Sequence, residues 1–167
     1  MLYPDFQIIQ IVRMPVVYLK IWIICISGSN FMEQLYFLAQ VIVAVALGAV
    51  VGWQRERQGK PAGPRTYALV SGGAALFTVL SMNAFIVGEN ARVASQIVIG
   101  IGFLGAGLIF HKGNHVENLT TAAGLWLTAA VGMAVGVGYY ILAVGSTLTA
   151  LLVLTLNDRG LKKISKD

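Results

Sequence analysis

Long apolar runs separated by short polar segments dominate the chain from Leu35 onward. A helix that crosses the hydrocarbon core of a bilayer needs about 17–25 predominantly apolar residues. Runs of about that length occupy residues 35–53, 67–88 and 93–110, and a run long enough for two helices occupies residues 119–157. The last run divides around Gly136, Gly138, Tyr139 and Tyr140, because glycines loosen a helix and tyrosines favour a membrane interface. The pattern predicts an all-α, polytopic transmembrane bundle of five spans, with the fourth ending near Gly138 and the fifth starting near Tyr139.

The first 31 residues do not fit this pattern, because their apolar stretch at residues 16–26 is short and contains Lys20. Three interpretations stay open: an interfacial helix anchored by Tyr18 and Trp22, a sixth span, or an upstream extension of a protein whose translation begins at Met32. The predicted organisation is an N-terminal extension (1–31), a transmembrane domain (32–158) and a basic cytoplasmic tail (159–167).

Composition excludes an ordinary soluble domain. The chain is 57% hydrophobic and 11% charged, with a mean hydropathy of +0.76, whereas soluble domains carry about 25% charged residues. The single cysteine, Cys25, excludes an intramolecular disulfide and a cysteine-based metal cluster. The net charge of +5 does not indicate nucleic-acid binding, because most basic residues flank apolar runs, where membrane topology places them.

The basic residues also predict an orientation. The segments after the first, third and fifth runs hold nine of them: Arg55, Arg57, Lys60, Arg65, Lys112, Arg159, Lys162, Lys163 and Lys166. The short loop between the second and third runs holds only Arg92. Because positively charged loops stay inside the cell, the first loop, the third loop and the C-terminus are predicted to be cytoplasmic.

The third run contains four glycines within residues 96–110. They allow two interpretations, a dinucleotide-binding turn or a membrane helix that packs closely against its neighbours. Gly100, Gly102 and Gly105 match a dinucleotide-binding fingerprint in their letters. That fingerprint requires a preceding strand, a following helix and an acidic residue about 20 positions later. The run has none of this context, so the glycines are interpreted as sites of close helix packing, and no cofactor is predicted.

At helical spacing these glycines fall on two faces. Gly100 and Gly107 lie on the face of Gln96, whereas Gly102 and Gly105 lie roughly opposite. Since small residues let membrane helices approach closely, the third span is predicted to be the central helix of the bundle. Further packing glycines are predicted in the first and fourth spans: Gly48, Gly52, Gly124, Gly132 and Gly136. A homo-oligomer formed through one of these faces is left open.

Chemistry is sparse inside the predicted spans. Acidic and basic side chains are absent from their middles, where proton and ion pathways usually carry them. The notable polar residues there, Gln40, Asn83 and Gln96, are expected to form interhelical hydrogen bonds. His111 and His115 are four residues apart, but Gly113 between them argues against a helical metal pair. No catalytic residue and no metal site is predicted.

A polar cluster is predicted at the cytoplasmic ends of the spans. Its residues are Arg55, Glu56, Arg65, Thr66, Thr120 and Thr121. Asn118 and the two threonines are plausible caps for the fourth span, whose first backbone amides point to the same surface. Arg55, Arg65 and these amides could form a site for an anion. The alternative is anchoring of the loop by lipid phosphates.

Several separated motifs resemble the MgtC/SapB family of bacterial inner-membrane proteins. They are Gly48-x-x-x-Gly52-x-x-Arg55 and the segments PAGPRTYALVSGGAALF, RVASQIVIGIGFLGAGLIF and NLTTAAGLWLTAAVGMAVGVG, in that order. The sequence departs from the family pattern at Gln54, where the family usually has glutamate. It departs again at Glu117 and Asn118, where the family usually has Arg-Gly. The soluble C-terminal domain of longer members does not follow residue 157.

The resemblance implies a non-enzymatic regulator of membrane partners, acting in adaptation to low magnesium and, in pathogens, in virulence. The implied partners are membrane lipids and membrane proteins, with the rotary ATP synthase and magnesium transporters as candidates. The alternative function is a small transporter or channel, or an accessory subunit in magnesium transport.

Overall fold

The computed structural model describes residues 31–83, 90–112 and 115–164. Contacts divide the chain into two units, Met1–Tyr36 and Phe37–Asp167, and the arrangement below concerns the second. The elements of the described chain are α2 (Phe31–Arg57), α3 (Pro64–Asn83), α4 (Asn90–Ala106), β1 (Phe110–Lys112), β2 (His115–Glu117), α5 (Leu119–Val137) and α6 (Tyr140–Ile164). The predicted extension at residues 1–31 lies almost entirely outside the described residues.

The five described helices lie where the five apolar runs predicted them, so the all-α class is confirmed. Two of them, α2 and α5, are long and apolar enough to cross a membrane, and α4 and α6 contain shorter apolar helices. The largest difference from the predicted bounds is in α6, which continues to Ile164, beyond the predicted end of the run at residue 157. The number of helices that cross the bilayer stays a prediction.

A glycine separates α5 from α6, as the sequence predicted. Gly138 has φ 91°, a left-handed conformation that glycine adopts without the steric strain of a Cβ atom. Its amide donates to Val135 O at 2.9 Å, and the amide of Tyr139 donates to Ala134 O at 2.8 Å. These bonds end α5 and let the chain reverse into α6.

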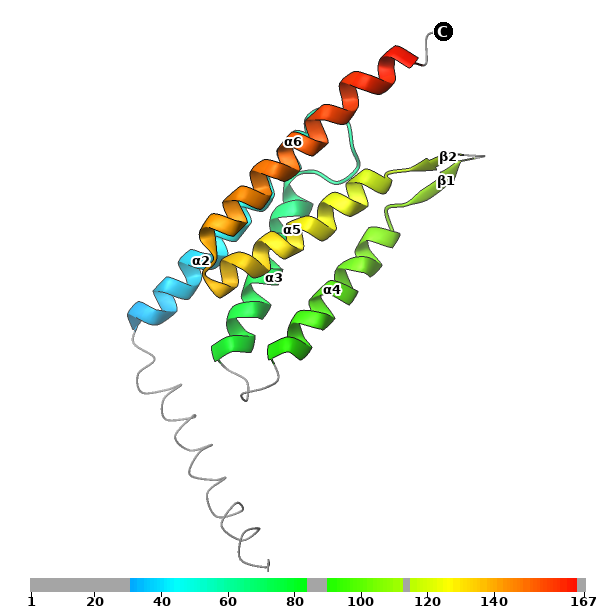
Figure 1. Ribbon diagram of the computed structural model, residues 1–167. Helices are drawn as coiled ribbons and strands as arrows, with labels where there is room; N and C mark the ends of the chain where they lie inside the picture. Colours follow the sequence, from blue (N-terminus) through cyan, green and yellow to red (C-terminus); the bar gives the residue numbers. More distant parts are fainter. Residues whose placement is uncertain (1–30, 84–89, 113–114, 165–167) are drawn as a thin grey trace, which may run out of the picture. The chain divides into compact units, whose positions relative to one another are not determined.

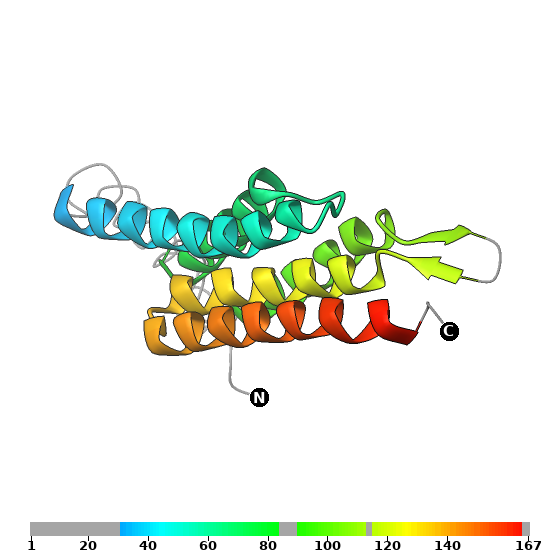
Figure 2. The same ribbon diagram turned by 90° about the horizontal axis from the view of Figure 1, so that it is seen from above.

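A short antiparallel hairpin, β1–β2, joins α4 to α5, where the sequence predicted only a loop. Its register pairs Phe110 with Glu117 and Lys112 with His115. Figures 1 and 2 place this hairpin, the start of α5 and the end of α6 at the same end of the second unit. This arrangement agrees with the prediction that the third loop and the C-terminal segment share one side of the membrane.

The central helix is α5, and the prediction of a central α4 is wrong. Helix α5 packs against α3, α4 and α6, and its backbone accepts a hydrogen bond from Gln40 of α2. In Figure 1 it lies between α4 and α6. Helix α4 packs mainly against α3 and α5 among the described elements. Glycine content misled the prediction because it does not show whether a neighbour faces each glycine.

Helix α3 is held closely by glycines of its two neighbours. A Cβ atom at Gly48 of α2 would lie 2.5 Å from Tyr67 O, and one at Gly52 would lie 2.5 Å from Pro64 Cα. On α5, a Cβ at Gly132 would overlap the carbonyl oxygen of Ser71. Similar close approaches surround Gly124 and Gly136. The missing side chains therefore set the distance between these helices, as is common for membrane helix pairs.

Candidate functional site

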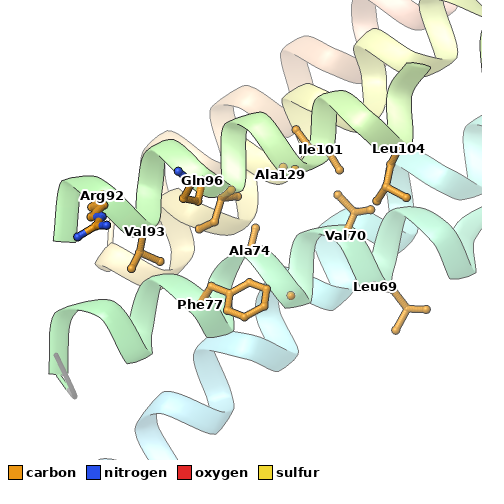
Figure 3. Close-up of a pocket in the computed structure, with 13 residues that line it drawn as sticks. Leu69, Val70, Ala74, Phe77, Arg92, Val93, Gln96, Ile101, Leu104 and Ala129 are labelled. Carbon is orange, nitrogen blue, oxygen red and sulfur yellow. The ribbon is translucent and has the colours of Figure 1, made fainter. Parts of the chain in front are cut away.

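An open groove runs between α3 and α4, with a volume of about 870 Å³. Figure 3 shows the two helices with Val70, Ala74 and Ile101 between them. Its lining is almost wholly apolar, and Ala129 of α5 contributes to it. In a membrane protein, a groove of this kind faces acyl chains or the side chains of another helix.

Two glycines keep the groove wide. Gly73 of α3 and Gly100 of α4 both line it, and a Cβ atom added at either would meet no other atom within 4 Å. These glycines differ from Gly48 and Gly132, whose faces are filled by neighbouring helices. The groove is therefore a place where small residues offer close approach and the described chain supplies nothing to approach them.

Two polar side chains of α4, Arg92 and Gln96, line the groove, and Gln96 contributes an amide. This side chain is exposed and lines the wall formed by α4. Within the described part of the chain, its amide forms no hydrogen bond. An amide without a hydrogen-bond partner in an apolar surrounding costs about 2–7 kcal/mol. Gln96 therefore favours an occupant of the groove that can form hydrogen bonds.

A second polar arrangement surrounds Arg55, at the C-terminal end of α2. This side chain is only 2% exposed. Its guanidinium donates to the Thr121 hydroxyl at 2.8 Å and to Gln58 Oε1 at 2.7 Å. Tyr67 donates to the Thr121 carbonyl at 3.0 Å. We call these four residues the Arg55 node, and they join α2, α3 and the first turn of α5.

The Arg55 node also has an unsatisfied group, because Arg55 Nε is buried and has no hydrogen-bond partner among the described residues. A guanidinium has no acceptor capacity and stays charged, so its burial requires several hydrogen bonds. The geometry gives Arg55 a structural function: it ties the end of α2 to the start of α5.

The other members of the predicted polar cluster do not join the Arg55 node. Glu56, Arg65, Thr66 and Thr120 are all exposed. In the part of the chain that the structure describes, the Arg65 side chain has no hydrogen bond or ion pair. The predicted anion site therefore does not form as a unit, since only Arg55 and Thr121 come together.

The predicted caps of α5 need correction as well. Asn118 occupies the N-cap position, but its side chain forms no capping hydrogen bond. It adopts φ 65°, a left-handed conformation that asparagine tolerates better than most residues. The hydroxyl of Thr121 in α5 accepts a hydrogen bond from the guanidinium of Arg55 in α2.

The predicted polar residues within spans behave differently from one another. Gln40 is buried and donates to Val135 O at 3.2 Å, which joins α2 to α5. Asn83 donates to Val79 O within its own helix at 2.8 Å, and among the described residues it forms no bond to another helix. Gln96 lines the open groove.

The two histidines are not one helical turn apart. His111 pairs with Val116 and His115 with Lys112 in the hairpin. Among the described residues, no group of three or more His, Cys, Asp or Glu side chains gathers as metal ligands do.

Sequence reasoning did not find Gln58, Tyr67 or Gly73. Gln58 and Tyr67 became part of the Arg55 node through the approach of three helices, which no local pattern encodes. Gly73 follows Gly72 directly in the sequence. The two glycines differ only in which neighbouring surface each one faces. Gly72 faces Val45 of α2, whereas Gly73 faces the groove.

Comparison with known proteins identifies relatives over most of the chain. The family model "MgtC family" matches residues 41–162. The Escherichia coli K12 protein "Putative magnesium transporter YhiD" is 40% identical over 127 residues, which are 71% of this chain and 59% of YhiD. "Protein MgtC" of Salmonella typhimurium LT2 is 38% identical over 130 residues, which are 78% of this chain and 56% of MgtC.

An uncharacterized protein of Haemophilus influenzae is 37% identical over 135 residues, which are 75% of this chain and 57% of that protein. The chain thus spans less than two thirds of the length of these relatives. No solved structure matches.

Proposed function

The chain belongs to the MgtC family, and from this premise we propose that it is a non-enzymatic regulator of other membrane proteins. It lies in the bacterial inner membrane, with its first loop, third loop and C-terminus in the cytoplasm. It acts during adaptation to low magnesium by binding transmembrane helices of its targets in the groove between α3 and α4.

The observation that carries this proposal is the open groove itself. The glycine faces at Gly48 and Gly132 are filled by neighbouring helices, whereas those at Gly102 and Gly145, which do not line the groove, are open. At Gly73 and Gly100 the same kind of face is open. A transmembrane helix brings apolar side chains for the walls and hydrogen-bonding groups for Gln96, and both properties fit this surface.

The interior of the bundle supports a regulator over a self-sufficient ion carrier. The buried polar side chains of the described residues include one charged group, the guanidinium of Arg55. A fixed positive charge repels Mg²⁺, which binds proteins through carboxylates and keeps several of its waters. The polar groups around Arg55 bind one another and join helices.

The targets we propose are the rotary ATP synthase and magnesium transporters, and lipids cover the remaining outer surface. Both targets are multi-helix membrane assemblies that can present a helix to a groove within the bilayer. The matched part of this chain covers only 59% of the length of YhiD. The activities of the longer relatives are therefore ascribed to this chain only as part of this proposal.

A second candidate function is magnesium transport, either by this chain as a small transporter or channel or as an accessory subunit. The printed name of YhiD, which describes a magnesium transporter, favours it. Magnesium flux through the purified chain in liposomes would support it, and the absence of flux would favour the regulator.

A pair of variants on α4 tests the regulator directly. Gly100→Leu fills the groove, whereas Gly102→Leu adds the same side chain to a different face, where it also meets no atom within 4 Å. Tagged variants expressed at equal levels are used to capture ATP synthase and magnesium transporters from native membranes, and growth at low magnesium is measured in parallel. We expect Gly100→Leu to lose both capture and growth and Gly102→Leu to keep both. Equal capture and growth with the two variants would contradict the proposal.

A further inference from the structure

The outer face of α2 changes from apolar to cationic near the C-terminal end of the helix. Val50 and Trp53 are 47% and 57% exposed, and Arg57, one helical turn after Trp53, is exposed as well. The guanidinium carbon of Arg57 lies 4.8 Å from the centre of the Trp53 ring, which is a cation–π contact. The buried residues of α2, among them Gly48 and Arg55, fall on the other side of the helix. This contact therefore faces away from the bundle.

The length of α2 places the contact in the interfacial layer of a membrane. The helix has 27 residues, which corresponds to about 40 Å at a rise of about 1.5 Å per residue. The hydrocarbon core of a bilayer is only about 30 Å thick. The last turn of α2 therefore extends beyond the core. Trp53 lies where tryptophans concentrate, at the level of the headgroups, and the cation of Arg57 lies at the depth of lipid phosphates.

Arg57 has hydrogen-bond donors to offer at that depth. In the part of the chain that the structure describes, its guanidinium forms no hydrogen bond and no ion pair. Its position over the Trp53 ring leaves the N–H groups of the guanidinium plane available, and their fork matches the oxygens of a phosphate. The neighbouring acid, Glu56, faces the α2–α3 loop instead, since a Cβ atom at Gly63 would lie 3.6 Å from its carboxylate oxygen.

We propose that the Trp53–Arg57 face of α2 binds one anionic glycerophospholipid. Arg57 holds the phosphate, Trp53 packs against the glycerol and ester groups, and an acyl chain lies along Val50. The apolar, aromatic and cationic side chains follow one another along the helix in the same order as the acyl chain, ester and phosphate of such a lipid. Tryptophan and arginine thus fix both the depth and the charge of the ligand.

The charge around the site selects an anionic headgroup over a zwitterionic one. Lys60 in the loop after α2 and Arg65 in the first turn of α3 add two cations, against the single acid Glu56. A zwitterionic lipid brings an ammonium group into this positive surrounding, whereas an anionic lipid brings no opposing cation. The site makes no use of the α3–α4 groove, so its failure would leave the proposed binding of target helices untouched.

Quenching of Trp53 fluorescence by brominated lipids tests the inference. Trp22 and Trp126 are replaced by phenylalanine, which leaves Trp53 as the single tryptophan. Vesicles then supply phosphatidylglycerol or phosphatidylcholine brominated near the top of the acyl chains. We expect preferential quenching by phosphatidylglycerol, and a preference about fivefold lower in Arg57→Gln. Arg65→Gln, the matched control, removes the same charge from an exposed side chain and should leave the preference nearly unchanged.

Native mass spectrometry of the chain with all its tryptophans supplies an independent measurement. The wild type released from membranes should retain phosphatidylglycerol, and Trp53→Leu, which keeps every charge, should lose it as Arg57→Gln does. Excess glycerol phosphate should not displace it, because the acyl chain contributes to binding. Displacement would show a site for free phosphate and overturn the lipid assignment. Equal quenching by both lipids in the wild type, or equal losses in Arg57→Gln and Arg65→Gln, would overturn the site itself.

Discussion

The guanidinium of Arg55 donates a hydrogen bond of 2.8 Å to the hydroxyl of Thr121, 66 positions later in the chain. Both side chains are buried, and the bond ties the last turn of α2 to the first turn of α5. Hydrogen bonds to charged groups contribute about 1.5–3 kcal/mol.

Removing the hydroxyl acceptor should therefore destabilise the bundle. We expect Thr121→Val, which keeps the shape of the side chain, to lower the free energy of unfolding by about 1.5–3 kcal/mol. Thr120→Val is the matched control, because Thr120 is the exposed neighbour. Unfolding in detergent, followed by circular dichroism, measures the stability of both variants. Equal stability of the two would show that the hydrogen bond between Arg55 and Thr121 does not stabilise the bundle.

The second prediction concerns the contact between α3 and α5. Gly132→Ala places a methyl group on the carbonyl oxygen of Ser71, so the two helices must move apart. Overpacking of this kind costs about 1–3 kcal/mol. Gly145→Ala on α6 meets no atom within 4 Å and should be neutral or slightly stabilising, because alanine favours a helix. Thermal unfolding of the two variants in the same detergent distinguishes them, and an unaffected Gly132→Ala would show that the helices are packed less closely.

The third prediction explains Gln54, where the family usually has glutamate. Gln54 Nε2 donates to Thr155 Oγ1 at 2.7 Å, while that hydroxyl donates to Leu151 O at 2.6 Å. Because the Thr155 proton is already used, position 54 must supply a donor, and an ionised carboxylate has none. We expect Gln54→Glu to weaken the contact of α2 with α6 and lower stability by about 0.5–1.5 kcal/mol.

Gln58→Glu provides the contrast to Gln54→Glu. Its carboxylate would face the Arg55 guanidinium, which already donates to Gln58 Oε1, so the loss of the bond from Gln58 Nε2 to Leu154 O is offset by an ion pair. Unfolding at neutral pH should show that Gln54→Glu is less stable than Gln58→Glu. The reverse order would contradict the assignment of Gln54 as the hydrogen-bond donor to Thr155.

The fourth prediction concerns Gly102 and Gly105 of α4, which the sequence analysis placed on the same face of the helix. Gly105 is buried, and a Cβ atom there would lie 3.6 Å from the Cβ of Ala122 on α5, whereas Gly102 is open. Gly105→Leu should therefore reduce the yield of folded protein, and Gly102→Leu should not. Size-exclusion chromatography of equal amounts of membrane checks this, and a normal profile for Gly105→Leu would show that α4 does not pack on α5 as described.

These residues show what local sequence pattern can and cannot predict. Hydropathy located the five helices, and Gly138 located the break before α6, because span length and backbone freedom are properties of neighbouring residues. The place of α4 at one side of α5 was not predictable, since Gly100 and Gly105 look alike in a sequence and differ only in what lies opposite. The meeting of Arg55 with Thr121, and the exclusion of Arg65 from it, likewise depend on how separate helices approach.

The central claim is that the α3–α4 groove binds a transmembrane helix, and a photo-activated crosslinker at Leu69 tests it most directly. Leu69 lines the groove and is 75% exposed, and Leu148 on α6, 61% exposed, is the control position. After irradiation of living cells, the account predicts discrete protein adducts from position 69 and only lipid adducts from position 148. Lipid adducts alone from both positions would contradict it.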